Sequence, residues 1–104
     1  MTSDPLLSAL LDARQRKEAA DRDVRLLVAY AREVVRPRPY RLVDLAKAAG
    51  MSISGVRVAY NRADTEQAAQ LTADAEWHIE VAVATLLATT QHQPAREHDT
   101  ITAA

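Results

Sequence analysis

Apolar residues recur at spacings of three and four along three stretches of the chain, a pattern typical of helices that pack on one face. The first stretch runs from residue 5 to about residue 35, where Asp4 can cap the helix and Pro5 suits the first helical position. The pattern favours one long helix, and a turn near residues 21–23 that would give two shorter helices is the alternative. Its apolar stripe comprises Leu6, Leu10, Ala13, Ala20, Val24, Leu27, Ala31 and Val34, and Lys17 interrupts it.

The first stretch ends at a short connector that carries three arginines, Arg36, Arg38 and Arg41, and two prolines. Each proline disfavours helix in the residue before it, so we expect an extended, stiff segment with its arginines directed outward. Such a segment is either a rigid linker with solvating charge or a phosphate-contacting element beside a DNA-reading helix.

The third stretch predicts a helix over residues 65–90 that is apolar around much of its circumference. One short neighbour cannot cover so wide an apolar surface, and a homodimer interface is one explanation. Packing of this helix on the first helix of the same chain is the other. The residues expected at a dimer interface are Leu71, Trp77, Ile79, Val83 and Leu86.

These stretches predict an all-α fold: a single helical domain over residues 1–90, followed by a disordered tail over residues 91–104. The composition agrees, since the chain has 21 alanines but only two glycines and four prolines.

The absence of cysteine excludes disulfide scaffolds, thiolate zinc sites and thiol nucleophiles. No apolar run approaches the ~20 residues of a membrane span, and we expect a cytoplasmic protein.

The net charge of −1 conceals a strong segregation of charge along the chain. Residues 14–62 contain twelve of the thirteen basic residues and only five acidic ones, while the flanking segments are acidic. A basic middle segment is typical of a polyanion-binding surface, and solvated charge on helix faces is the simpler alternative.

The second apolar stretch, residues 42–61, lies in the C-terminal part of the basic segment and has the spacing of two short helices that cross steeply. Ala46 is small where two backbones would approach, and Gly50 suits a left-handed helix end. Ser52 can cap the second helix, which we expect to run to Asn61. Gly55 is unusual inside a helix, and either close approach to a phosphate or a neutral surface position explains it.

The order Asp44, Leu45, Ala46, Ala49, Gly50, Met51, Ser52, Val56 and Asn61 closely resembles the helix-turn-helix of lactose-repressor-type regulators. Tetracycline-repressor-type regulators share much of the same core. The resemblance covers about 20 of the 104 residues. It departs from the lactose-repressor type because a long helix precedes the motif and too few residues follow it for a sugar-sensing domain.

The resemblance implies that the second helix of the motif lies in the major groove of double-stranded DNA. Arg57 is the strongest candidate for a base contact, because its guanidinium can bridge two acceptors of guanine. The residues expected to face the bases are Ile53, Ser54, Arg57, Val58 and Asn61. Contacts to the phosphate backbone are expected from Arg36, Arg38, Arg41, Lys47, Ser52 and Arg62.

Other chemistry is weakly represented in the sequence. His78 is two residues from both Glu76 and Glu80, which is not the spacing that places two ligands on one helical face. No Gly-rich phosphate loop or nucleophile–base pair is evident, so we expect no enzymatic activity, no metal and no cofactor.

The sequence predicts a nucleoid-associated dimeric regulator that binds DNA. The alternative is a protein-interaction module that docks on a larger partner through its apolar C-terminal helix.

Overall fold

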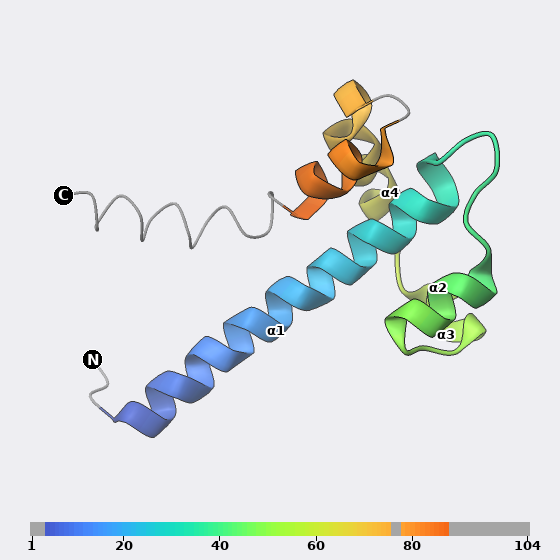
Figure 1. Ribbon diagram of the computed structural model, residues 1–104. Coiled ribbons are helices and arrows are strands. Elements are labelled where there is room, and N and C mark those ends of the chain that lie inside the picture. The colour runs from blue at the N-terminus through green and yellow to red at the C-terminus, as the bar shows by residue number, and fades with distance from the viewer. Residues whose placement is uncertain (1–3, 76–77, 88–104) are drawn as a thin grey trace.

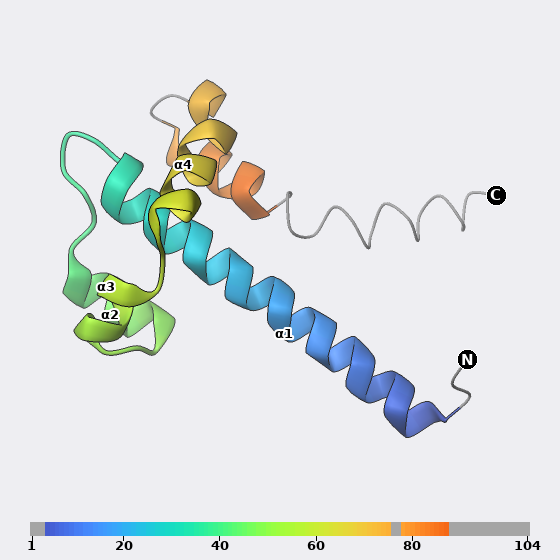
Figure 2. The same cartoon turned by 180° about the vertical axis from the view of Figure 1, so that it is seen from behind.

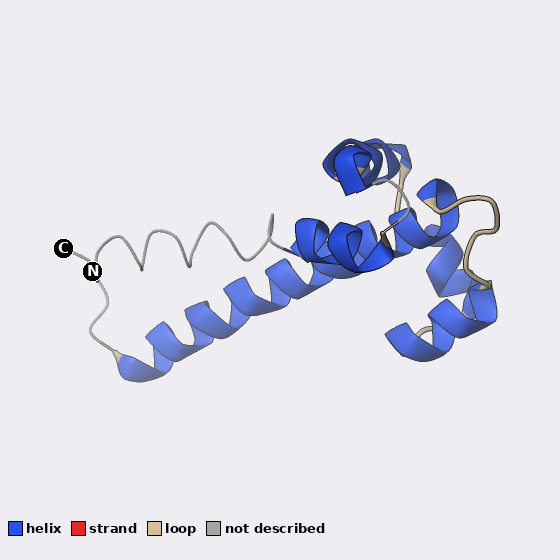
Figure 3. Ribbon diagram, turned by 45° about the horizontal axis from the view of Figure 1, so that its top comes forward, coloured by secondary structure: helices blue, strands red, loops and turns tan. Residues whose placement is uncertain are grey.

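The computed structural model describes residues 4–75 and 78–87, and within these residues the protein contains only helices and their connections. The predicted all-α class is therefore confirmed. Figure 1 shows one long helix, with the shorter helical segments gathered around its C-terminal half. The same arrangement without strands is visible in Figure 3.

The long helix α1 runs from Pro5 to Ala29 and continues without interruption into a π-helical turn, η1, from Tyr30 to Val34. The carboxylate of Asp4 caps it by accepting hydrogen bonds from the N–H groups of Leu6 and Leu7, at 2.8 and 3.2 Å. Of the two alternatives left by the sequence, the structure therefore has one helix. The reason is local, since no glycine or proline lies between Pro5 and Val34.

The N-terminal half of α1 projects from the rest of the molecule, as Figures 1 and 2 show from opposite sides. All residues from 4 to 18 are exposed. Three ion pairs between residues four apart lie on this projection: Asp12–Arg16, Arg14–Glu18 and Lys17–Asp21, at 3.0–3.2 Å. Exposed pairs of this kind stabilise a helix by only about 0.3–0.5 kcal/mol each.

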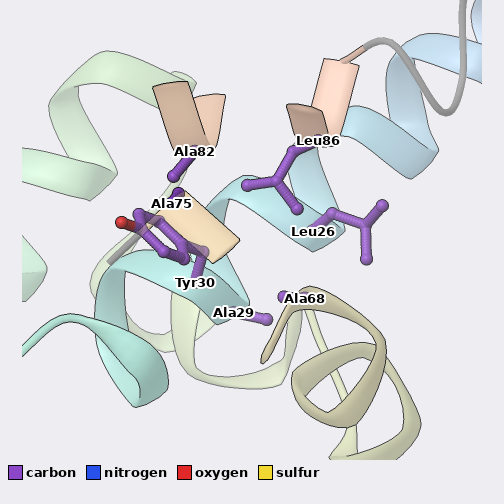
Figure 4. Close-up of a cluster of buried hydrophobic side chains, with 7 residues drawn as sticks. All are labelled: Leu26, Ala29, Tyr30, Ala68, Ala75, Ala82 and Leu86. Atoms are coloured by element: carbon purple, nitrogen blue, oxygen red, sulfur yellow. The ribbon is translucent and has the colours of Figure 1, made fainter. Parts of the chain in front are cut away.

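A first hydrophobic cluster surrounds the C-terminal half of α1 (Figure 4). Leu26 and Leu86 are its largest fully buried side chains, each 1% exposed. The cluster joins α1 and η1 to helix α4 (Arg62–Leu71), to the single 3-10 turn η2 (Ala73–Ala75) and to a helical segment over residues 79–87. Its buried members are Leu26, Ala29, Tyr30, Ala68, Ala75, Ala82 and Leu86.

A second cluster joins α1 to two short helices, α2 (Leu42–Ala49) and α3 (Ile53–Val58). Val28, Ala46 and Val56 are its buried residues. Tyr60 packs against both clusters, so the connection between α3 and α4 holds the two parts of the core together.

The prediction of one C-terminal helix over residues 65–90 is wrong. Helix α4 ends at Leu71, where the hydroxyl of Thr72 donates a hydrogen bond to the carbonyl of Ala68 at 2.8 Å. A straight helix rises about 1.5 Å per residue, so it would place Leu86 about 27 Å from Ala68. Because the chain turns back after α4, Ala68 and Leu86 reach the same cluster and bury their side chains together.

Candidate nucleic-acid interface

The turn between α2 and α3 depends on the conformation of Gly50, which ends α2 with φ at +68°. The left-handed conformation costs little for glycine and is unfavourable for residues with a Cβ. The N–H of Met51 donates to the carbonyl of Ala46 at 2.9 Å and closes the turn. Ala46 is 6% exposed and Val56 is fully buried in the same cluster, so the small side chain of Ala46 lets the two helices approach.

Ser52 caps α3, and its hydroxyl accepts a hydrogen bond from the N–H of Gly55 at 2.9 Å. A Cβ on Gly55 would lie 3.1 Å from this hydroxyl oxygen and 3.6 Å from the side chain of Met51. A side chain at position 55 would therefore be in tight contact with the cap of α3.

Helix α3 is shorter than the sequence predicted, because it ends at Val58 instead of Asn61. Asn61 caps the next helix: its side chain accepts from the N–H of Asp64 at 2.9 Å, and the Asp64 carboxylate accepts from the N–H of Asn61 at 3.0 Å. The prediction that Asn61 belongs to the base-reading helix is therefore wrong, because Asn61 is the N-cap of α4.

The outer face of α3 is fully available for contact. Val56 is completely buried and fixes the helix against α2 and α1, whereas the remaining four candidate residues are exposed. Val58 is the most open large apolar residue, at 81% exposed. The four exposed candidates are Ile53, Ser54, Arg57 and Val58.

The predicted phosphate-contacting residues all lie at the surface of the molecule. The connector between η1 and α2 is anchored at Tyr40, whose N–H donates to the carbonyl of Ala31 at 3.0 Å and whose carbonyl accepts from Arg32 at 2.6 Å. This connector, α2 and α3 together carry five cationic side chains and the single acid Asp44. The exposed members of the predicted set are Arg36, Arg38, Arg41, Lys47, Ser52 and Arg62.

Two of these arginines also have partners within the chain. Arg36 donates to the carbonyl of Val35 at 2.9 Å, and Arg62 pairs with Glu66 at 3.1 Å. Both contacts are at the surface, where an ion pair contributes little and a phosphate can compete for the guanidinium.

Tyr60, in the connection between α3 and α4, is tied to η1 through its hydroxyl, which donates to the carboxylate of Glu33 at 2.5 Å. Burial raises the pKa of the Tyr60 phenol above its ordinary value of 10.0, and the hydrogen bond to Glu33 raises it further. Tyr60 is thus a positioning residue in the structure, and its phenol is held in the neutral form.

Some of the residues predicted at a dimer interface lie in the core of the single chain, and others lie near its surface. Leu86 is 1% exposed within its own chain and Leu71 packs partly buried on the same cluster, so both serve the core of the single chain. Ile79 and Val83 remain near the surface. Trp77 and the predicted tail over residues 91–104 lie outside the described residues.

A pocket of about 160 Å³ lies between α1, α2 and the helical segment over residues 79–87. Sequence reasoning missed it, because it is lined by residues from four separate parts of the chain. The signals in the sequence were that Leu27 and Ala31 belong to the apolar stripe of the first helix and that Ile79 and Val83 belong to the apolar C-terminal stretch. The lining residues are Leu27, Tyr30, Ala31, Tyr40, Leu45, Ile79 and Val83.

Comparison with known proteins gives no further assignment, since no family model, no curated protein and no solved structure matches this chain. Among the residues that the structure describes, no helix combines the length and the apolar composition needed to cross a membrane. No group of three or more histidine or carboxylate side chains in the same part of the chain is placed to hold a metal ion.

Proposed function

We propose that the protein binds double-stranded DNA as a sequence-specific regulator and places α3 in the major groove. The observation that carries the proposal is the way α3 packs: Val56 is fully buried, while Ser54 and Arg57 are exposed on the same short helix. A helix fixed in this way presents its outer side chains in one orientation, as base recognition requires.

In this function Arg57 supplies specificity, because its planar guanidinium can donate two hydrogen bonds to guanine. Ile53 can contact a thymine methyl group, and Ser54 can hydrogen-bond to a base edge or a phosphate. The resemblance of residues 44–56 to the helix-turn-helix of lactose-repressor-type regulators supports the same orientation of the motif.

Affinity in this function comes from the cations around α3, since contacts to phosphate position a protein without reading sequence. Arg38 lies in the connector before α2 and Lys47 lies in the last turn of α2, and both are exposed. The hydroxyl of Ser52 uses an acceptor site for the cap of α3, which leaves its O–H free to donate to a phosphate.

One observation favours a second function, in which the same surface binds a protein. Val58 is 81% exposed and Ile53 is 44% exposed, and both side chains are apolar on a helix that would otherwise face a polar groove. A partner with an apolar groove would cover both.

Fluorescence anisotropy of the full chain on random and genomic duplexes, measured over a series of salt concentrations, tests the proposal. We expect enrichment of particular fragments and an affinity that falls steeply with salt. Arg57→Ala should cost about 1–3 kcal/mol on the preferred sequence and reduce the preference itself. Arg38→Ala should weaken binding equally on all sequences and reduce the salt slope by about one.

Comparison of these two variants distinguishes contacts that determine sequence preference from electrostatic contacts that raise the affinity for every sequence. If Arg57→Ala behaves like Arg38→Ala, then α3 does not read sequence. If the chain binds no duplex at low salt, the DNA-binding proposal is wrong and the protein-binding surface becomes the leading assignment.

A further inference from the structure

The projecting half of α1 carries leucines that no part of the described chain covers. Leu6 is 74% exposed, Leu10 is 64% exposed, and Leu7 and Leu11 are each more than half exposed. An isolated helix of this length is marginally stable in water, and exposed leucines on it indicate a contact with another surface.

The exposed leucines at 6 and 10 begin a seven-residue repeat that follows one face of α1 for its whole length. Spacings of four and three alternate from Leu6 to Ala31, the arrangement by which two helices pair along a shared seam. Leu7 and Leu11 lie outside the seam, and their own stripe continues into Arg14, Glu18 and Asp21. The seam comprises Leu6, Leu10, Ala13, Lys17, Ala20, Val24, Leu27 and Ala31.

The C-terminal end of the seam opens into the pocket described above. The chain's own helices cover other faces of α1, where Leu26, Val28 and Ala29 are buried. Leu27, which is partly buried, and Ala31, which is 6% exposed, line the pocket together with Tyr30, Ile79 and Val83. Its volume of about 160 Å³ is close to the ~150 Å³ that holds a benzene molecule, so it can accept an aliphatic side chain.

We propose that a second copy of this chain occupies the pocket, with the two α1 helices packed antiparallel along the seam. Leu10 of each copy then lies against Leu27 of the other, and Leu6 lies against Ala31, at the pocket. Leu10 and Leu27 are 17 residues apart, about 26 Å along the helix. A two-fold axis midway between them places Leu6 and Leu10 of each copy at the pocket of the other copy. The two contacts are then identical, as in the self-complementary interface of a symmetric dimer.

The charges beside the seam support this register. It places Arg14 near Asp21 of the second copy and Arg16 near Asp23 of the second copy, and the two-fold axis repeats both pairs. Asp23 has a buried carboxylate oxygen that accepts no hydrogen bond in the single chain, so a nearby cation would stabilise its charge.

Other arrangements of the same two helices bring like charges together. A shift of one seven-residue repeat in one direction places Arg14 and Arg16 against their own equivalents, and a shift in the other direction does the same for Asp21 and Asp23. A parallel pair would place Lys17 against Lys17, whereas the proposed register places it against Ala20. Electrostatic repulsion therefore disfavours the alternatives.

Light scattering on the full chain tests the pairing independently of any DNA binding. The chain mass of 11.4 kDa predicts a dimer of about 23 kDa. Leu10→Glu should give the 11.4 kDa monomer with its circular dichroism spectrum still helical, because Leu10 is exposed in the single chain. The matched control is Leu11→Glu, which changes an exposed leucine outside the seam and should leave the dimer intact. A monomeric wild type, or a dimer that survives Leu10→Glu and not Leu11→Glu, overturns the proposal.

Disulfide trapping tests the orientation, since the natural chain has no cysteine. In the antiparallel pair, a mixture of Lys17→Cys and Ala20→Cys chains should give mainly the mixed disulfide, because positions 17 and 20 face each other. Predominant crosslinking of Lys17→Cys to itself would indicate a parallel pair and contradict the register. Neither result depends on whether α3 binds DNA.

Discussion

Gly50 and Tyr60 are two residues whose roles follow from their own conformation and contacts. Gly50 sets the turn between α2 and α3 through its positive φ, and Tyr60 joins both hydrophobic clusters. The role of Gly50 was predictable from its place at the end of a helical pattern. The hydrogen bond of Tyr60 to Glu33 was not, because these residues are 27 positions apart.

Gly50→Ala should lower the free energy of unfolding by about 1–2 kcal/mol, the cost of a left-handed backbone for a residue with a Cβ. Nothing lies within 4 Å of the added Cβ, so the backbone conformation is the sole source of the cost. Gly50→Asn is the control and should cost less, because asparagine tolerates this conformation. Urea denaturation measures both, and equal stability of wild type and Gly50→Ala would contradict the assigned φ.

Tyr60→Phe should cost about 1 kcal/mol at pH 7 through loss of the hydrogen bond to Glu33. Folding raises the pKa of the Tyr60 phenol, so its contribution is complete below pH 10 and is lost as the pH rises through the raised pKa. Urea denaturation above pH 10 should therefore show a smaller loss of stability for Tyr60→Phe than for wild type. The variant should retain some alkaline sensitivity, because the pKa of buried Tyr30 is raised as well. An identical alkaline loss in both proteins would show that the Tyr60 phenol does not contribute.

At the scale of the elements, α1, α3 and α4 each begin at a residue whose side chain caps the helix. Asp4 starts α1, Ser52 starts α3, and Asn61 together with Asp64 starts α4. The sequence pattern located the first two. It extended α3 too far, because the turn between α3 and α4 contains neither glycine nor proline and is defined by the cap at Asn61.

Asn61→Ala should destabilise the protein by about 1 kcal/mol through loss of the cap of α4. Asn61→Asp is the matched control, since its carboxylate can accept the same hydrogen bond from Asp64 and should preserve most of the stability. Thermal unfolding followed by circular dichroism distinguishes the two. Equal destabilisation by both substitutions would argue against a capping role for Asn61.

At the scale of the whole molecule, stability is concentrated around the C-terminal half of α1. Leu26 is 1% exposed within the first cluster, whereas Leu11 on the same helix is 52% exposed. The protein therefore consists of a packed helical body and a projecting helical arm (Figure 1).

Leu26→Ala should cost about 2–5 kcal/mol, because it removes buried apolar atoms and leaves a cavity. Leu11→Ala makes the same chemical change on the projecting arm and should alter stability by less than about 0.5 kcal/mol. Guanidinium denaturation of both variants measures the difference. Similar costs for the two would mean that the arm is as tightly packed as the body.

The sequence alone determined the features that depend on neighbouring residues. These are the helical class, the start of the first helix at Asp4, the left-handed Gly50 and the cap at Ser52. Each involves propensities or hydrogen bonds that span four residues or fewer, so the local sequence contains the necessary information.

The tertiary structure decided the features that depend on residues far apart in the chain. The turn after Leu71 brings Ala68 and Leu86 into the same cluster on α1. The apolar stripe in the sequence is equally compatible with one straight helix, so it does not predict this turn. The burial of Leu86 and the opening of the pocket beside Leu27 follow from the same turn. Which apolar residues form the core and which remain available to a partner is therefore set by the packing of the helices together.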